Sequence, residues 1–197
     1  MSTVTDAPIR TALPSSARTI ARWMISFLGF PLGGLAAWLL TGPVVDTTSA
    51  VTGGLLTGAI LGAAQAWALS ADRRLFTTWT LATAIGMAGG LTTGATLVNF
   101  STGLVDLALQ GAVSGGVVGL AQAVALWRRT GPLALAWPAY LAGAWAAGWT
   151  VTTLAGIGVD EQFTVFGASG ALVATLLTAV LPLVLRTGHG SHRASAA

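Results

Sequence analysis

The sequence predicts an all-α integral membrane protein, with six transmembrane helices arranged as three tandem helical hairpins and both termini in the cytoplasm. Three observations lead to this fold class: few charged residues, six apolar segments and a repeated row of glycines. The 197 residues are 54% hydrophobic and only 8% charged, whereas a soluble domain has about 25% charged residues. A chain with so little charge is suited to lipid and could not cover a soluble surface.

Six apolar segments carry this prediction. Each holds about 20 residues, enough for a helix to cross a hydrocarbon core of about 30 Å. Their interiors contain no Asp, Glu, Lys, Arg or His. The predicted spans are Trp23–Thr41, Val51–Leu69, Trp79–Val98, Leu107–Leu126, Leu133–Leu154 and Phe163–Leu185.

The charged residues orient these spans. Arginines occur only before the first span, after the second, after the fourth and after the sixth, at positions 10, 18, 22, 73, 74, 128, 129, 186 and 193. The alternate loops instead hold Asp46, Asp106, Asp160 and Glu161. The positive-inside rule therefore places both termini in the cytoplasm. The first segment is long, lacks a small-residue cleavage site and precedes five more spans, so we expect an anchor and not a removed signal peptide. Because the arginines stand singly or in pairs beside apolar segments, the net charge of +3 does not predict nucleic-acid binding.

A glycine pattern occurs twice in the chain, 57 residues apart. Glycines at every fourth residue clear one face of a helix, so that another helix can approach its backbone closely. We expect these faces to pack against neighbouring helices. The first copy consists of Gly54, Gly58, Gly62 and Gln65, and the second of Gly111, Gly115, Gly119 and Gln122.

The repeat extends to helical hairpins. Trp23, Trp79 and Trp137 open the first, third and fifth spans, and the third span adds a glycine row of Gly86, Gly90 and Gly94. The predicted hairpins cover residues 21–72, 77–129 and 133–186, between disordered cytoplasmic tails at 1–20 and 187–197. The last hairpin is degenerate, because its small residues Gly167, Ala171, Thr175 and Ala179 are followed by neither Gln nor an arginine pair.

A Trp-led helix followed by Gly-x-x-x-Gly-x-x-x-Gly-x-x-Gln and arginines resembles a group of uncharacterised multi-pass membrane proteins of bacteria. Those proteins usually have Gln-Trp after the glycines, whereas this chain has Gln65-Ala66-Trp67 and Gln122-Ala123-Val124. The resemblance covers the first two hairpins best. It implies a helical-hairpin fold in the bacterial cytoplasmic membrane and implies no activity.

Gln65 and Gln122 are the most informative polar residues inside the predicted spans. Either they hydrogen-bond to neighbouring helices, or they face a cavity or a solute path; we predict the structural role. Trp145 and Trp149, one turn apart, either pack against a helix or contact a hydrophobic ligand. Five further tryptophans lie near the predicted cytoplasmic ends of the spans and are expected in an aromatic belt at that interface: Trp23, Trp67, Trp79, Trp127 and Trp137.

No catalytic or metal site is predicted. The chain has no cysteine, and the outer acidic residues lack a second type of ligand. Gly167-Ala168-Ser169-Gly170 looks like the nucleophile motif of rhomboid intramembrane proteases. Those enzymes use a histidine as the general base, and the two histidines of this chain, His189 and His192, lie in the tail on the opposite predicted side.

Three classes of function remain. The sequence favours a non-enzymatic accessory or scaffold subunit, or a protein that binds lipid or a hydrophobic ligand, with no cofactor. Its expected partners are membrane lipids, other membrane subunits or further copies of itself. The alternative is a small-solute permease, a channel or the substrate-binding subunit of a transporter. An intramembrane enzyme is disfavoured, because no charged residue or histidine lies within a predicted span.

Overall fold

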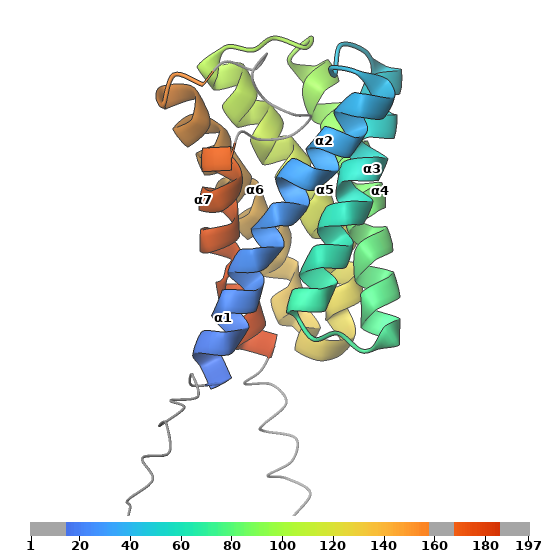
Figure 1. Ribbon diagram of the computed structural model, residues 1–197, viewed down its shortest axis with the longest axis vertical. Helices are drawn as coiled ribbons and strands as arrows, with labels where there is room; N and C mark the ends of the chain where they lie inside the picture. Colours follow the sequence, from blue (N-terminus) through green and yellow to red (C-terminus); the bar gives the residue numbers. More distant parts are fainter. Residues whose placement is uncertain (1–14, 158–167, 186–197) are drawn as a thin grey trace, which may run out of the picture.

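The computed structural model describes residues 15–157 and 168–185, and all regular structure within these ranges is helical. The chain begins with three consecutive helical segments, α1 (Ser15–Ile25), the 3-10 turn η1 (Ser26–Leu28) and α2 (Gly29–Thr41). Together they form one long rod (Figure 1). Residues 15–20 were predicted to belong to a disordered tail, but they are helical, because α1 continues the first span by two turns toward its arginines.

The remaining helices follow in antiparallel succession (Figure 1). They are α3 (Thr47–Ala68), α4 (Arg73–Leu97), α5 (Leu104–Thr130), α6 (Trp137–Leu154) and α7 (Ala168–Thr178). A 3-10 segment, η2 (Gly131–Ala136), leads from α5 into α6. Beyond Thr178 the chain makes a turn at Ala179 and is helical again to Leu185.

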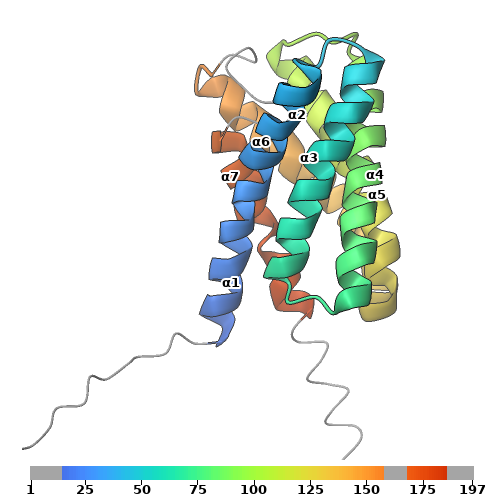
Figure 2. The ribbon, with the colours of Figure 1, turned by 45° about the vertical axis from the view of Figure 1, so that its right-hand side comes forward.

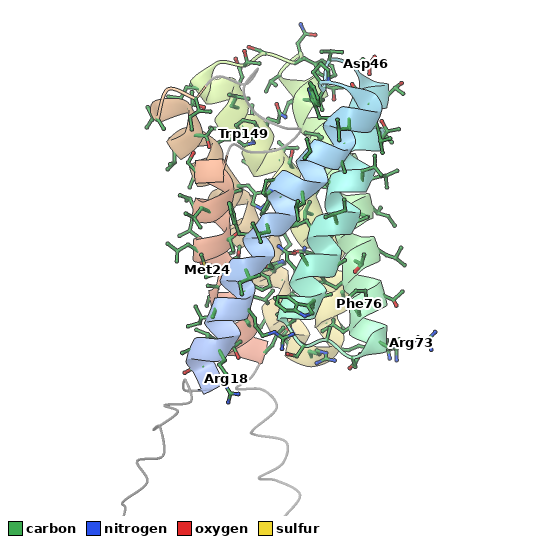
Figure 3. The ribbon with its side chains drawn as sticks, in the orientation of Figure 1. Arg18, Met24, Asp46, Arg73, Phe76 and Trp149 are labelled. Atoms are coloured by element: carbon green, nitrogen blue, oxygen red, sulfur yellow. The ribbon has the colours of Figure 1, made fainter. Side chains whose placement is uncertain are left out.

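Helices that follow one another in the chain are neighbours in space, and α7 returns to lie against α1, η1 and α2. The six helical rods therefore close into a ring (Figures 1 and 2). The end that holds the start of α1 and the α3–α4 connection is called the arginine end here. Arg18 and Arg73 lie there, while Asp46 lies at the opposite end (Figure 3).

Three helical stretches are long and apolar enough to cross a membrane: Ser16–Thr41, Thr47–Ala68 and Leu104–Leu154. The third contains both α5 and α6, which pack against each other. Ser169–Leu185 is a shorter apolar helix. These lengths and compositions identify a helical membrane protein.

Polar side chains and glycines fix the helix ends. Asp46 caps α3 through a reciprocal arrangement in which its carboxylate accepts from the Ser49 backbone N–H at 2.8 Å. Asp72 caps α4 without a return bond, and its carboxylate accepts from the Leu75 backbone N–H at 2.8 Å. Gly42 ends α2 and Gly131 ends α5 with positive φ angles of 74° and 55°, a backbone conformation that favours glycine.

Candidate functional site

The glycine row of α3 faces α4. A Cβ atom on Gly58 would lie 2.7 Å from the Ala84 Cα, and one on Gly62 would lie 2.9 Å from the Thr80 Cα. These are contacts with backbone, which cannot rotate away as a long side chain can. The absence of side chains on this face is therefore what allows α3 and α4 to pack so closely.

The glycines of α5 face α6 in the same manner, since a Cβ on Gly115 would lie 2.6 Å from the Leu141 carbonyl oxygen. The row on α4 faces α5: a Cβ on Gly90 would lie 2.7 Å from the Ser114 carbonyl oxygen. Helix α4 thus presents glycines to α5 and receives those of α3. The glycine faces lie inside the bundle and are occupied by its own helices.

Three tryptophans that donate indole hydrogen bonds between helices are called the tryptophan set here: Trp23, Trp79 and Trp137. Their exposed fractions are 1%, 0% and 8%, so the prediction that they stand in an interfacial belt is wrong. Only Trp67 and Trp127 of the five are about half exposed. A tryptophan of an aromatic belt and a buried tryptophan can both lie near a helix end. They differ in whether the residue is on the lipid-facing or the inward-facing side of its helix.

Each indole of the tryptophan set donates to a different helix. Trp79 Nε1 lies 3.2 Å from Gln65 Oε1, and Trp137 Nε1 lies 2.8 Å from Gln122 Oε1. Both pairs join one predicted hairpin to the next. The predicted structural role of the two glutamines agrees with this geometry. The tryptophan partners were missed, although separations of 14 and 15 residues suit a helix, a short turn and a return.

The third indole connects the beginning of the described chain to its end. Trp23 Nε1 donates to the Thr175 carbonyl oxygen at 3.0 Å and lies 3.3 Å from Thr178 Oγ1. Thr178 follows Gln122 by 56 residues, as Gln122 follows Gln65 by 57. A threonine hydroxyl therefore occupies the position where the first two hairpins have an amide. Because the pattern of the first two hairpins predicts a glutamine in the third, it does not identify Thr178 as the residue equivalent to Gln65 and Gln122.

The two glutamines differ in their surroundings. Gln122 is 2% exposed and makes two side-chain hydrogen bonds, because its Nε2 also donates to Thr83 Oγ1 at 2.9 Å. Gln65 is half-buried and its amide oxygen accepts from one indole. The interior at this level offers amides, hydroxyls and indoles, which exchange hydrogen bonds but carry no charge.

We expect the replacement of Gln122 by leucine to lower the unfolding free energy by about 1.5 kcal/mol. The replacement of Gln65 by leucine should lower it by about 0.6 kcal/mol, the average for one transmembrane hydrogen bond. The larger loss follows from two severed bonds that leave Trp137 and Thr83 without this partner. Unfolding in one detergent, compared between the two variants, measures the difference. Equal losses would contradict the assigned bonding pattern.

Trp145 and Trp149 lie in the core, where both are buried. Trp145 meets the ring of Phe30 edge to face, with centroids 5.9 Å apart. Both also border Gly111, where a Cβ would lie 2.9 Å from the Trp145 carbonyl oxygen. The Trp149 ring and the Trp145 backbone occupy the space that Gly111 leaves open, which accords with helix packing and not with a ligand at the surface.

A small cavity, called the central cavity here, lies beside Trp23 and Trp137. Its volume is about 10 Å³, close to the minimum of about 10–15 Å³ that one water molecule requires. Side chains from α1, α2, α3, α5, α6 and α7 line it: Trp23, Phe30, Leu61, Gln65, Val118, Gln122, Trp137, Leu141, Trp145, Ala174 and Thr178. Both glutamines thus border the same narrow space.

The acidic and serine candidates do not form a site among the described residues. Asp46 caps α3 and Asp106 accepts from Ser101 Oγ, and no cluster of metal-ligating side chains occurs within the ranges described. Ser169 Oγ lies 3.3 Å from Thr152 Oγ1. Gly167, Asp160, Glu161, His189 and His192 lie outside the described residues.

Two arginines bind the loops of the arginine end. Arg22 donates to Ser70 Oγ at 2.6 Å and to the Trp67 carbonyl, and its guanidinium lies 4.6 Å from the centre of the Trp67 ring. Arg129 forms an ion pair with Asp72. The Leu75 backbone N–H, and then Arg129, hold the pKa of Asp72 below its usual value. This pair was missed, although Asp before a helix and Arg at the end of another indicate it.

Comparison of the chain with protein-family models, with curated proteins and with solved structures finds no match.

Proposed function

We propose that this chain is a six-span protein of the bacterial cytoplasmic membrane, with both termini in the cytoplasm, that acts without catalysis as an accessory or scaffold subunit. Its three tandem hairpins pack through glycine-rich faces inside one bundle. The outward surface, which is rich in exposed leucine, isoleucine and valine, meets lipid or other membrane subunits.

Six spans are supported by the ring of helical rods. Helix α4 has 25 residues and lies between α3 and α5, so it runs through the same layer although its arginines and threonines lower its hydropathy. The Leu104–Leu154 stretch supplies two rods, α5 and α6. Arg18 and Arg73 at one end and Asp46 at the other (Figure 3) agree with the charge asymmetry of the positive-inside rule.

The packed interior is the observation that most supports a function other than transport. The glycines bring neighbouring backbones together, the tryptophans fill the centre, and the central cavity holds about 10 Å³. A solute path requires a wider space and usually an ionisable residue along it. The described part of the bundle instead offers a packed core in which amides and indoles satisfy one another.

A second candidate, the small-solute permease, is favoured by one observation. A recess of about 370 Å³ opens at the arginine end, lined in part by Thr19, Ser70 and Arg129. The tryptophan set lies deeper along the bundle, with Gln65 and Gln122 at the small cavity. The recess and the central cavity share no lining residue, so a permease would require the side chains between them to move apart.

Cysteine substitution distinguishes the two candidates cleanly, because the chain has no cysteine of its own. Leu61→Cys, Val118→Cys and Ala174→Cys each place a thiol at the central cavity, and Ser70→Cys provides an exposed control. A charged, membrane-impermeant thiol reagent should label the control and leave the three inner thiols unreacted. Labelling of the inner thiols from water would replace the scaffold proposal with the permease.

Partner binding is tested by mild-detergent purification of the full chain, followed by mass spectrometry. An accessory subunit should retain a membrane protein at a fixed molar ratio through gel filtration. Purification of the chain alone, with cysteines at the cavity reactive toward water-soluble reagents, would contradict the accessory role.

The topology has its own test. Reporter fusions after Arg74, after Arg129 and at Ala197 should lie in the cytoplasm, because arginines accumulate on that side. Fusions near Asp46, Asp106 and Asp160 should lie outside. A single reversed loop would be incompatible with six spans.

A further inference from the structure

A groove of about 430 Å³ runs along the outside of the bundle at the arginine end, between α4 and α5. Its walls combine basic and apolar side chains: Asp72, Arg74, Leu75, Thr78, Val124, Ala125, Arg128 and Arg129. It lies on the outer surface and is separate from the central cavity, with which it shares no lining residue.

The charge of the groove is positive. Three arginines and one aspartate line it, which gives a balance of +2. The carboxylate of Asp72 caps α4 and binds Arg129, and the lowered pKa keeps it ionised at neutral pH. Arg74 and Arg128 are exposed, and neither has an acidic partner within the described residues. These two guanidinium groups are available to an anion.

Apolar surface continues from the groove toward the middle of the bundle. Val124 is 78% exposed, and Leu120 lies one turn further along α5 and is also exposed. On α4, Thr78 is followed at helical spacing by Leu81 and Ile85, both exposed. A ligand held by Arg74 and Arg128 would therefore have its charged part beside the loops and its apolar part against these side chains.

We propose that this groove binds the headgroup of an anionic glycerophospholipid, with the phosphate between Arg74 and Arg128 and an acyl chain along Leu81, Ile85 and Leu120. Basic pockets between transmembrane helices suit such headgroups, and guanidinium groups bind phosphate through paired hydrogen bonds. The inference rests on the bundle's being embedded in a membrane and is independent of whether it acts as a scaffold or as a permease.

The test uses the purified full chain in a neutral detergent, titrated with phosphatidylglycerol or phosphatidylcholine of identical acyl chains. Native mass spectrometry counts bound lipid and thermal unfolding reports stabilisation. Phosphatidylglycerol should bind more tightly. Arg74→Gln and Arg128→Gln should each weaken it about fivefold, since a basic residue near an anionic lipid contributes roughly that much.

Arg73→Gln is the matched control, because Arg73 carries the same charge one residue away, does not line the groove and projects away from the bundle (Figure 3). It should leave phosphatidylglycerol binding unchanged, and Arg74→Lys should retain more binding than Arg74→Gln. Equal binding of the two lipids, or an equal loss in Arg73→Gln, would overturn the proposal. So would equally tight binding of soluble glycerol phosphate, because the acyl chain would then contribute nothing.

The same data separate this proposal from the proposed function. Loss of lipid preference with an intact partner complex and unreactive inner cysteines would refute the lipid site alone. Reactive inner cysteines with a retained lipid preference would refute the scaffold alone.

Discussion

Replacement of Gly115 by alanine should lower the unfolding free energy by about 2–3 kcal/mol, the upper part of the range for overpacking a core. The added Cβ would lie 2.6 Å from the Leu141 carbonyl oxygen and 3.0 Å from its carbonyl carbon. Both are backbone atoms, so α5 and α6 must separate along their length to admit one methyl group. Thermal unfolding in detergent measures the loss.

The neighbouring glycine supplies the control. A Cβ on Gly116 would have the Ala142 Cβ at 3.8 Å as its nearest neighbour, an ordinary van der Waals distance. Gly116→Ala should therefore be neutral or slightly stabilising. The α3–α4 contact offers a parallel comparison, in which Gly58→Leu should be more destabilising than Ala59→Leu, as Gly115→Leu should be relative to Val117→Leu. Equal effects within each pair would mean that these glycines do not set the helix separation.

Replacement of Trp23 by alanine should lower the unfolding free energy by about 3–5 kcal/mol, because it empties a fully buried aromatic site. Trp23 also makes the only indole hydrogen bonds described between the first rod and α7. Its loss should open the ring between α1 and α7. Unfolding measurements give the stability, and labelling of Ala174→Cys, at the central cavity, reports the opening.

Trp23→Phe separates packing from hydrogen bonding, since it keeps an aromatic ring and removes the N–H. It should cost about 1 kcal/mol, in the range of individual transmembrane hydrogen bonds, and should leave Ala174→Cys protected. The closure would not depend on this residue if Trp23→Ala left that thiol unreactive toward a water-soluble reagent.

The helical architecture followed from the sequence because lipid requires internally bonded helices and because apolar length is read directly. The placement of glycines against neighbouring helices also followed from the sequence, because a helix face without side chains lets another helix approach its backbone closely. The predicted structural role of Gln65 and Gln122 rested on their register with the glycines, and the structure supplies the partners that the register implied.

The tryptophans were harder to place. Trp67 lies at the end of one apolar segment and Trp79 begins the next, so both are near the arginine end. Trp67 is nevertheless half exposed, whereas Trp79 is fully buried. Hydropathy does not distinguish these faces, because an indole is suited both to an interface and to a core with a hydrogen-bond acceptor. The ion pair between Asp72 and Arg129 depends on how two connections meet, which a helix pattern alone does not determine.

The indole bonds differ in how far apart their partners are in the chain, and this has a consequence for biosynthesis. Trp79 and Trp137 find their glutamines 14 and 15 residues away, so each pair can join as soon as its turn emerges from the ribosome. Trp23 must wait for residues 152 and 155 positions later. Until α7 is synthesised, the first rod therefore keeps an open flank, which the insertion machinery or lipid must shield.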